Sequence, residues 1–509
     1  METNKIVNQP KKQGGKHAYK YTHQGMNNEQ GFSHSLKRTK IVATVGPACQ
    51  EYDQLLELVK AGVNVFRLNF SHGDHGNKKE VIDRIRLISK NEPFNIAILA
   101  DLQGPKLRVG DLEGGSLLLE EGKTFIFTTE KIVGTLEKVY VSYPHLTTDV
   151  KVGERIFIDD GKMEVKVEEI LNDKEVKMSV KLGGVLLPKK GVNLPDSHLS
   201  MPSLTEKDLI DLDFILTQNL DWLALSFVRK AEDITALKKI IEDHGSKLKV
   251  IAKIEMPEAL KNIRDIIVES DGIMVARGDL GVEIPIEQVP IIQKDIIKKC
   301  MHRAKPVIVA TQMMESMLDR TKPNRSEVSD VANAVYEGAD AVMLSAETAT
   351  GQYPLLVVQT MTNIIKEVEK TVFNYNREDL LAPQPHSPSF LSDAICYNAC
   401  KLASDSHANA LIGMTQSGYT AFMLSSYRPR TPLYIFSKEK SLINQLSLSW
   451  GVRAFYYGEE DSLDDIIQDQ LDILQSRGFI ETGNIVVNTG STPVADHLPT
   501  NIIKISRVE

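Results

Sequence analysis

The sequence predicts an α/β protein whose centre is a closed (β/α)8 TIM barrel, with an inserted all-β lid domain and a carboxyl-terminal α/β domain. Three observations lead to this fold class. Short runs rich in β-branched residues alternate with stretches that carry apolar residues at three- and four-residue spacing, which indicates βα units and a parallel sheet. There are eight such runs, the number that a barrel needs. Polar residues follow nearly every run, where barrel enzymes place their sites.

Each predicted barrel strand is six or seven residues long, which suits a strand better than a helix. An open sheet of eight strands is the alternative arrangement. The predicted strands are residues 40–46, 64–70, 95–101, 222–228, 249–255, 272–277, 306–311 and 341–346.

The helical spacing is lost between the third and fourth runs, over residues 105–194. Asp160-Gly161 there predicts a hairpin turn. Gly104-Pro105 and residues 191–195 are turn-prone connections, so this all-β domain is expected to close as a lid over the barrel. A purely structural insert is the alternative. Alternation of apolar and polar residues predicts lid strands at 124–129, 138–143, 155–160 and 175–180.

The two ends of the chain differ from the barrel in pattern. Residues 1–34 are polar and have no helical or strand period, which predicts a disordered extension. They have neither the apolar core of a secretory signal nor the arginines of a mitochondrial presequence. A long helix is expected to end near Asn374, and the prolines of residues 378–389 mark a linker. The predicted domains are the extension 1–34, the barrel 35–104 and 195–376, the lid 105–194, and a regulatory α/β domain 377–509.

Composition limits the classes of function. The chain has 509 residues, of which 42% are hydrophobic and 25% charged, as in soluble globular proteins, and this length fits about three domains. No run approaches the roughly 18 apolar residues of a membrane-spanning helix, so no membrane partner is expected. Acidic residues outnumber basic ones by 68 to 60, which argues against a nucleic-acid partner.

The cysteines are too few for a disulfide framework in a chain of this length, which favours a reducing, cytoplasmic location. Cys396 and Cys400 stand one helical turn apart. No second pair of Cys or His residues completes a tetrahedral metal site with them, so we interpret them as packing residues. The four cysteines are Cys49, Cys300, Cys396 and Cys400.

The sequence has no GxG, Walker A, HExxH or GxSxG motif. The candidate catalytic residues lie instead at the ends of the predicted barrel strands. Arg67, Asn69 and Ser71 recur with period two, while Leu68 and Phe70 take the opposite face. One strand therefore directs three polar groups to one place. An edge strand with one solvated side is the alternative.

A second strand repeats this pattern. Lys253 and Glu255 are two residues apart and point the same way, and the turn Arg277-Gly278-Asp279 supplies another carboxylate after the next strand. Glu255 and Asp279 together suit Mg²⁺ or Mn²⁺, which prefer oxygen ligands. Structural ion pairs within these two segments are the alternative.

Further polar residues complete a ring. Thr311 and Glu347 have ordinary explanations as a backbone partner and a helix cap. As a group, however, cations, carboxylates and hydroxyls around one barrel mouth suit phosphoryl transfer, because cations neutralise phosphate oxygens. The additional strand-end residues are Asp101, Thr311, Ser345 and Glu347.

Longer motifs point to one family. Through them the chain resembles the pyruvate kinases over nearly its whole length after the extension. The resemblance implies transfer of the phosphoryl group of phosphoenolpyruvate to ADP, the last step of glycolysis, by a cytoplasmic homotetramer. The segments are, in order, KIVATVGPA, FRLNFSHG, DLQGPKLRVG, GVNLP, KIEM, ARGDLGVEIP, ATQMMESM, DVANAVYEGADAVMLSAETATGQYP and SSYRPRTPLY.

The resemblance also implies roles for the strand-end residues. Glu255 and Asp279 would bind the divalent ion, Lys253 would stabilise the transferring phosphoryl group, and Arg67 would reach the same phosphate. The substrate carboxylate would be held by Thr311 and by the backbone of Gly278 and Asp279, at a helix start. The second step, protonation of the enolate, would use a hydroxyl and water relay through Thr311, Ser345 and Glu347.

On the nucleotide side, the resemblance implies contacts from residues after the second strand, from the lid and from a later helix. A strand-end cap is the alternative for His72. The implied nucleotide-binding residues are Asn69, His72, Arg108 and Lys207.

One segment departs from many members of the family. Those members require K⁺ and have a threonine, a lysine and a glutamate where this chain has Leu102, Gln103 and Lys106. That pattern resembles a potassium-independent branch, in which the Lys106 ammonium supplies the monovalent charge without binding entropy. K⁺ is therefore expected not to be required. The residues of this cation site, or of its Lys replacement, are Asn69, Ser71, Asp101, Leu102 and Lys106.

A loop of the carboxyl-terminal domain predicts an effector site. Hydroxyls and backbone N–H groups at a helix start form an anion nest, and in sugar-phosphate-activated relatives this loop holds a phosphate. A sugar-phosphate or AMP effector is expected, and an ordinary helix cap is the alternative. The later segment GSTPVADHLPTN lacks the extended arginine- and glycine-rich loop of animal fructose-bisphosphate enzymes, so the effector's identity stays open. The loop consists of Thr415, Gln416, Ser417, Gly418, Tyr419 and Thr420.

Two other functions fit part of the pattern. A metal-dependent lyase or aldolase would also use two carboxylates to stabilise an enolate, but the lid, Lys253 and the nucleotide-side residues favour transfer to ADP. A binding module that has lost catalysis would be expected to lack Lys253, Glu255 or Asp279, and all three are present.

Overall fold

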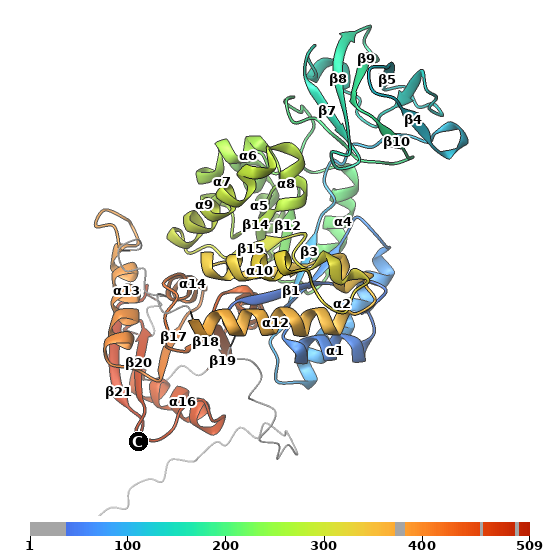
Figure 1. Ribbon diagram of the computed structural model, residues 1–509. Helices are drawn as coiled ribbons and strands as arrows, with labels where there is room; N and C mark the ends of the chain where they lie inside the picture. The colour runs from blue at the N-terminus through green and yellow to red at the C-terminus, as the bar shows by residue number, and fades with distance from the viewer. Residues whose placement is uncertain (1–36, 372–381, 459–461, 494–497) are drawn as a thin grey trace, which may run out of the picture. The chain divides into compact units, whose positions relative to one another are not determined.

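The computed structural model describes residues 37–371, 382–458, 462–493 and 498–509 (Figure 1). Residues 37–509 cluster as one compact unit. The predicted extension 1–34, the predicted helix end near Asn374 and the first part of the predicted linker lie outside the described residues. No helix of the described ranges is long and apolar enough to cross a membrane.

The predicted barrel is confirmed. All eight predicted runs form parallel strands of one closed barrel, and β1 pairs with both β2 and β16 to close it. Most strands end before the predicted boundary, because the chain leaves the sheet at the residues that build the barrel mouth. The strands in barrel order are β1 (Lys40–Thr44), β2 (Val65–Asn69), β3 (Ala97–Asp101), β12 (Trp222–Leu225), β13 (Lys249–Ile254), β14 (Gly272–Ala276), β15 (Val307–Ala310) and β16 (Ala341–Leu344).

Helices surround the barrel strands (Figure 1). Two short 3-10 helices, η2 (Ile286–Gln288) and η3 (Glu315–Leu318), lie in the connections after β14 and β15. The α-helices are α1 (Tyr52–Ala61), α2 (His75–Asn91), α4 (Glu206–Thr217), α5 (Ala231–Asp243), α6 (Pro257–Lys261), α7 (Ile263–Glu269), α8 (Arg277–Glu283), α9 (Val289–His302), α10 (Arg325–Glu337), α11 (Ala346–Ala349) and α12 (Pro354–Thr371).

Successive residues of each barrel strand face opposite sides. In β1, for example, Ile41 and Ala43 pack in the core that includes the helices, and Val42 packs inside the barrel. Leu448, from the carboxyl-terminal domain, completes the interior cluster. The interior is therefore filled, and polar strand-end side chains gather at the open end. The interior residues of the strands are Val42, Val65, Ala97, Leu99, Trp222, Ala224, Ile251, Met274, Ile308, Ala310, Ala341 and Met343.

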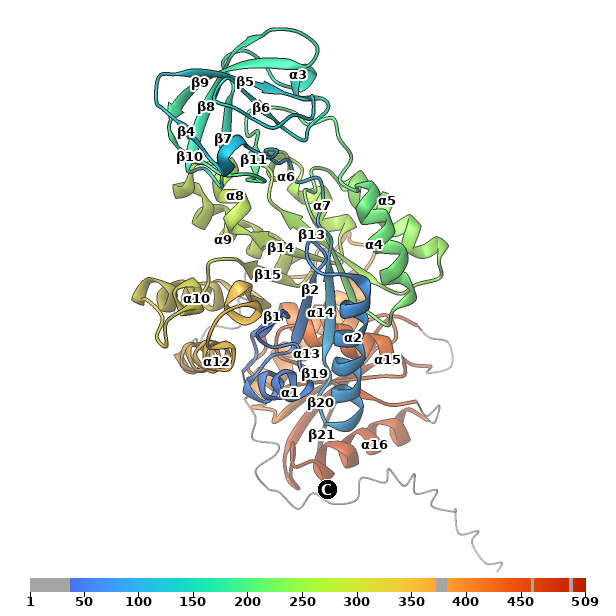
Figure 2. The ribbon, with the colours of Figure 1, turned by 90° about the vertical axis from the view of Figure 1, so that its right-hand side faces the viewer.

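The lid is an all-β domain, as predicted, and its strands lie together in Figure 2. The Asp160-Gly161 turn joins two antiparallel strands, and both residues have positive φ angles, 56° and 84°. Sequence patterns did not single out β4, β8 or β10. A six-stranded sheet and a two-stranded sheet are formed by β4 (Leu117–Leu119), β5 (Thr124–Thr128), β6 (Lys138–Tyr140), β7 (Arg155–Ile158), β8 (Met163–Ile170), β9 (Glu175–Leu182), β10 (Gly184–Leu186) and β11 (Val192–Asn193), with η1 (Glu113–Gly115) and α3 (Leu146–Asp149) between strands.

The entry to the lid needs glycine at position 104. Gly104 has φ +69°, and a Cβ there would lie 2.8 Å from the ring of Phe227 and 2.9 Å from Cβ of Ser226. Its N–H donates to the buried carboxylate of Asp208 at 3.1 Å. The chain therefore leaves the barrel through a tightly packed turn directly above β12.

The carboxyl-terminal domain is a five-stranded sheet with helices, as predicted. Strand order is β19-β18-β17-β20-β21, and only β21 is antiparallel to its neighbour. Cys396 and Cys400 are buried in its apolar core, which supports their interpretation as packing residues. The elements are α13 (Phe390–Asp405), β17 (Ala410–Met414), α14 (Tyr419–Ser426), β18 (Leu433–Ser437), α15 (Lys440–Gln445), η4 (Leu446–Leu448), β19 (Val452–Tyr456), α16 (Leu463–Ser476), β20 (Ile485–Gly490) and β21 (Ile502–Arg507).

Candidate active site

The polar residues of β2 point where their spacing predicts. Leu68 and Phe70 are buried in the core that includes the helices. Arg67 and Asn69, on the other face, are only partly buried. Arg67 thus extends into the barrel mouth from between two apolar positions, and the alternative of a solvated edge strand is excluded because β2 lies between β1 and β3.

One buried carboxylate holds two cations at the mouth. Arg67 Nε donates to Asp101 Oδ2 at 2.6 Å, and Lys253 Nζ lies 3.4 Å from Asp101 Oδ1. Asp101 is only 1% exposed. A buried carboxylate needs positively charged partners, and a buried cation needs a negatively charged one. The three side chains therefore hold one another in place.

Each cation has a further partner on a neighbouring strand. Arg67 Nη1 donates to the hydroxyl of Thr44 at 3.0 Å, and Lys253 Nζ donates to the hydroxyl of Ser226 at 2.7 Å. Lys253 Nζ also lies 2.8 Å from Glu255 Oε1. Thr44 and Ser226 were not predicted as site residues, because both lie inside the predicted strands 40–46 and 222–228. In the structure, Thr44 ends β1 and Ser226 directly follows β12.

Charge pairing outweighs burial at Asp101 and Lys253. Burial alone would raise the pKa of Asp101, but Lys253 and Arg67 lower it below its ordinary value. Burial alone would lower the pKa of Lys253, but Asp101, Glu255 and Asp279 raise it above its ordinary value. Both groups are therefore charged at neutral pH.

Glu255 and Asp279 form the predicted pair of carboxylates. Burial raises the pKa of Glu255, and the charge of Asp279 raises it further, while Lys253 lowers it. Glu255 Oε2 accepts a hydrogen bond from the N–H of Phe227 at 2.8 Å. Two carboxylates that repel each other in a buried site are the donor set that a hard divalent cation neutralises.

Those two carboxylates do not complete a metal site by themselves. Within the part of the chain that the structure describes, no group of three or more His, Cys, Asp or Glu side chains is arranged to hold a metal ion. Remaining ligands would have to come from water and from substrate oxygens, which is typical of Mg²⁺.

The loop after β15 is strained and braced. Thr311 and Gln312 have φ angles of +69° and +55°, a region that a β-branched residue rarely adopts. Arg277 Nη2 donates to the carbonyl of Thr311 at 2.7 Å, and the N–H of Gly278 donates to Thr311 Oγ1 at 2.8 Å. The start of α8 and the hydroxyl of Thr311 are thereby held together.

Ser345 and Glu347 also lie together at the end of β16. Glu347 is buried, and its two oxygens accept hydrogen bonds from the N–H of Ser345 at 2.7 Å and the N–H of Met314 at 3.2 Å. Burial raises the pKa of Glu347. Glu347 therefore connects the ends of β15 and β16, a bracing contact that the sequence did not predict.

The residues predicted to contact nucleotide lie at two places. One is the loop after β2, and the other is the lid base, the paired connections 107–109 and 189–193 between barrel and lid. Lys207 Nζ donates to the carbonyl of Phe70 at 2.7 Å, which places it beside that loop. Asn69 Oδ1 accepts from the N–H of Ser71 at 3.0 Å, and His72 is exposed. Arg108 Nη1 donates to the carbonyl of Lys189 at 2.9 Å across the lid base.

Of the three residues that differ from potassium-requiring members, Gln103 is half-buried, and the other two occupy different surroundings. Leu102 is 1% exposed and packs in the apolar core, so its side chain supplies no oxygen. Lys106 is exposed and lines a small cavity at the lid base together with Asp160, Asp279 and Glu283.

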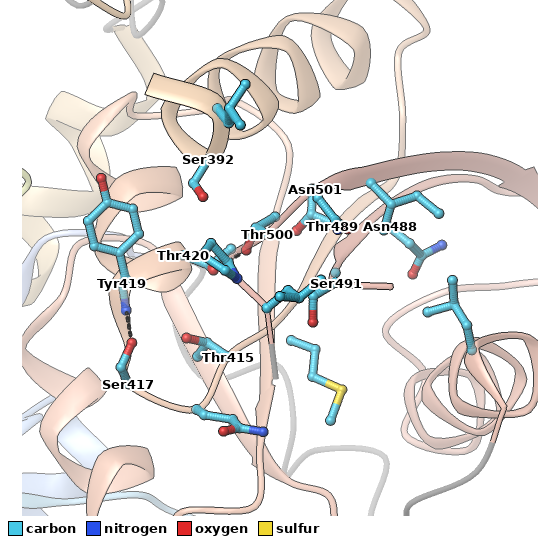
Figure 3. A pocket seen from close by; sticks show the side chains of 18 of the residues that line it. Ser392, Thr415, Ser417, Tyr419, Thr420, Asn488, Thr489, Ser491, Thr500 and Asn501 are labelled. Carbon is cyan, nitrogen blue, oxygen red and sulfur yellow. Dashed lines mark hydrogen bonds between the residues drawn. The ribbon is translucent and has the colours of Figure 1, made fainter. Parts of the chain in front are cut away.

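A second cavity, of about 800 Å³, lies in the carboxyl-terminal domain beside the loop 415–420 (Figure 3). Gly418 has φ +91°, and its N–H donates to Thr415 Oγ1 at 3.0 Å. Hydroxyl groups from this loop and from the end of β20 line the cavity, including those of Thr415, Thr420 and Thr489.

Sequence comparison decides the family. Residues 36–358 match the family description "Pyruvate kinase, barrel domain", and residues 393–506 match "Pyruvate kinase, alpha/beta domain". The chain belongs to the pyruvate kinase family. A pyruvate kinase of Geobacillus stearothermophilus is 41% identical over 92% of this chain and 80% of its own length. One of Clostridium perfringens is 40% identical over 93% of this chain and 100% of its own length.

A solved structure agrees with this assignment. The crystal structure of a pyruvate kinase from Cryptosporidium parvum matches with a TM-score of 0.88 at 35% identity, covering 93% of this chain and 96% of that one. The predicted fold and the predicted reaction class are thus confirmed: pyruvate kinases are phosphotransferases of glycolysis that use phosphoenolpyruvate and ADP, and the family generally uses a divalent metal.

Proposed function

We propose that the Asp101 cluster is where this chain carries out the pyruvate kinase reaction. Lys253 stabilises the phosphoryl group in transit, and Arg67 contacts the same phosphate. The single observation that supports this most is that Asp101 holds both cations, Arg67 by a hydrogen bond of 2.6 Å and Lys253 by an ion pair of 3.4 Å. Cations held in place before substrate arrives need no reorganisation during the reaction, which is how electrostatic catalysis works.

Glu255 and Asp279 hold the divalent metal, Mg²⁺ or Mn²⁺, in this proposal. The fit is supported by the buried carboxylate of Glu255, whose raised pKa reflects burial and the neighbouring negative charge of Asp279. When bound, such an ion neutralises charge on phosphate and enolate oxygens.

Thr311, with the backbone of Gly278 and Asp279, holds the substrate carboxylate. The braced positive-φ conformation of Thr311 and the hydrogen bond from the N–H of Gly278 support this role. Protonation of the enolate uses Thr311, Ser345 and Glu347. Burial raises the pKa of Glu347, which favours its protonated form, and Glu347 fixes the backbone of Ser345 at 2.7 Å.

ADP binds on the side of the loop after β2. Lys207 and Arg108 bring two cations to this side, one beside Phe70 and one at the lid base. Asn69, the last residue of β2, and His72, in the loop that follows, complete the nucleotide side. Phosphate groups of ADP would be attracted to these cations.

The direct test is formation of pyruvate from phosphoenolpyruvate and ADP by the full chain. We expect pyruvate and ATP in equal amounts, no pyruvate without ADP, and loss of activity when EDTA removes divalent metal. Lys253→Met should lower kcat by on the order of 10²–10³-fold, because the charge that stabilises the phosphoryl group is lost.

Lys239→Met is the matched control, since Lys239 is an exposed lysine of α5. It should leave kcat unchanged. Pyruvate formation without ADP would instead favour the lyase or aldolase alternative, and equal activity of Lys253→Met and the unmodified chain would contradict the assignment of Lys253.

We also propose that the enzyme needs no K⁺. Leu102 cannot coordinate a cation because its apolar side chain is buried in the core. Lys106 brings a basic side chain to a cavity that it shares with three carboxylates, among them Asp279. A tethered charge of this kind avoids the entropy of binding a free ion.

Activity in tetramethylammonium buffer, free of K⁺ and Na⁺, tests this proposal. Adding KCl should change kcat by less than about twofold for the unmodified chain, whereas Lys106→Glu should lose activity and regain part of it with KCl, as removal of a unit charge near the site implies. A rise of more than about tenfold on adding KCl to the unmodified chain would contradict the role of Lys106.

We propose that the cavity beside the loop 415–420 binds an allosteric effector, and that AMP suits it better than a sugar bisphosphate. Lys504 is the one charged residue among the described residues that line it, and Lys504 is paired with Asp464 at 2.7 Å. A bisphosphate would bring up to four negative charges against that single cation.

Two buried amides support recognition of a nucleobase. Asn488 is 4% exposed and Gln470 is 3% exposed, and both amide atoms of Asn488 and Nε2 of Gln470 have no hydrogen-bond partner among the described residues. They lie beside the apolar side chains of Ile466 and Ile467 in the cavity wall. An apolar slot with unpaired amide donors and acceptors suits the face and edge of a base.

Saturation curves for phosphoenolpyruvate, recorded with AMP, a sugar monophosphate and a sugar bisphosphate, test the effector. AMP should lower the half-saturating concentration by about fivefold or more. Gln470→Leu should abolish this shift, and Gln468→Leu, on the exposed side of the same helix, should preserve it. Activation by the sugar bisphosphate alone, or a hyperbolic curve that no compound changes, would contradict the proposal.

Three remaining expectations stay proposals. The enzyme acts as a homotetramer in the cytoplasm, which the relationship to pyruvate kinases supports. Domain limits are those predicted from the sequence, 35–104 with 195–376, 105–194 and 377–509.

A further inference from the structure

The two connections between barrel and lid are bonded to each other. Val192 N–H donates to the carbonyl of Leu107 at 3.0 Å, and Arg108 and Gly191 form an antiparallel bridge. Strand β11, which begins at Val192, also pairs with β7 of the lid. The outgoing and returning chains thus form one small ladder, here called the lid base (residues 107–109 and 189–193).

One side chain of the barrel reaches this lid base with a hydrogen bond. Asn193 Nδ2 donates to Glu283 Oε1 at 2.7 Å. Glu283 is the last residue of α8, and the first turn of the same helix carries Gly278 and Asp279. This contact therefore joins the lid base to the helix that presents two proposed substrate and metal residues.

The second carboxylate oxygen of Glu283 is buried, and no contact within the described part of the chain satisfies it. Glu283 is 6% exposed, and its Oε2 is buried without a hydrogen-bond partner among the described residues. Burial raises the pKa of Glu283 to about 7, with Asp279, Glu255 and Asp196 raising it and Asn193 lowering it. An unpaired buried oxygen costs about 1–3 kcal/mol, so a role for it is expected.

The basic side chain of Lys106 lines the small cavity that Glu283 also lines. Lys106, Asp160, Asp279 and Glu283 all line the cavity at the lid base, so one basic side chain shares it with three acidic ones. The Cε atom of Lys106 lies 3.5 Å from the place that a Cβ on Gly191 would occupy, so its side chain lies against the returning chain.

We propose that Glu283 is a positioning residue that fixes the lid base to α8, one oxygen holding Asn193 and the other accepting the ammonium of Lys106. Both connections of the lid then meet at one carboxyl group. Since the same short helix carries Gly278 and Asp279, the placement of the lid and of the substrate loop is set together. Only this last consequence rests on the proposed function.

Hydrogen exchange of the full chain, followed by mass spectrometry without substrate, tests the tether. In Glu283→Gln the amides of Val109, Lys189 and Val192 should exchange about fivefold faster or more, because the charge that holds Lys106 is gone. Peptides from 163–182, far along the lid strands, should be unchanged. Glu287→Gln, which removes an exposed carboxylate four residues away, should change neither region.

Asn193→Ala is the second variant, because it removes the other half of the tether without touching Glu283. The Glu283→Gln/Asn193→Ala double variant should exchange no more than about twofold faster than the faster single variant, as expected for groups that act as a unit. Unchanged exchange at the lid base in both single variants would overturn the proposal. So would a uniform acceleration across the barrel strands, which would show a merely structural role.

Kinetics then separate this inference from the proposed function. If the chain converts phosphoenolpyruvate and ADP, Glu283→Gln should raise KM for ADP more than it lowers kcat, because Arg108 belongs to the lid base. If no pyruvate is formed by the unmodified chain, the proposed function fails, but the exchange result still decides whether Glu283 tethers the lid.

Discussion

Two cations share the buried carboxylate of Asp101, and the rest of the site is arranged around that fact. Asp101 stands at the end of β3, with Arg67 on β2 beside it and Lys253 reached across the barrel mouth. Because apolar side chains fill the barrel interior, these polar side chains point toward the open end of the barrel. The bonds to Thr44 and Ser226 then fix each cation from a further strand, so five strands, β1, β2, β3, β12 and β13, position two charges.

A small number of contacts also joins the loop at Thr311, α8 and the lid base. Arg277 and Gly278 brace the strained loop at Thr311, and the far end of their helix carries Glu283 toward the lid base. A helix of seven residues therefore connects the loop at Thr311, the proposed metal ligand Asp279 and the lid base. Glycine at 104 allows the chain to leave the barrel directly above Ser226, which keeps the lid entry close to Lys253.

Much of this could be predicted from the sequence, because strand periodicity reports which face a residue takes. The eight barrel strands, the lid and the opposite orientations of Arg67 and Leu68 follow from period-two patterns. Contacts between distant segments could not be predicted. Ser226 contacts Lys253 only because β12 and β13 are neighbours in the barrel. Glu347 accepts a hydrogen bond from the N–H of Met314 across two strand ends. The unpaired oxygen of Glu283 is a property of the folded chain that its place in the sequence does not indicate.

Asp101 acts as a charged, buried anchor for two cations, and the stability of Asp101→Asn tests this role most directly. Because the folded state holds the pKa of Asp101 below its ordinary value, its contribution to stability is present above about pH 4 and is lost as pH falls through the folded-state pKa. Urea unfolding should show Asp101→Asn less stable by about 3–5 kcal/mol at pH 7, with the difference shrinking as pH falls below about 4. Asp83→Asn, on an exposed helix face, should change little. A loss below about 1 kcal/mol, or a difference that grows as pH falls, would contradict the account.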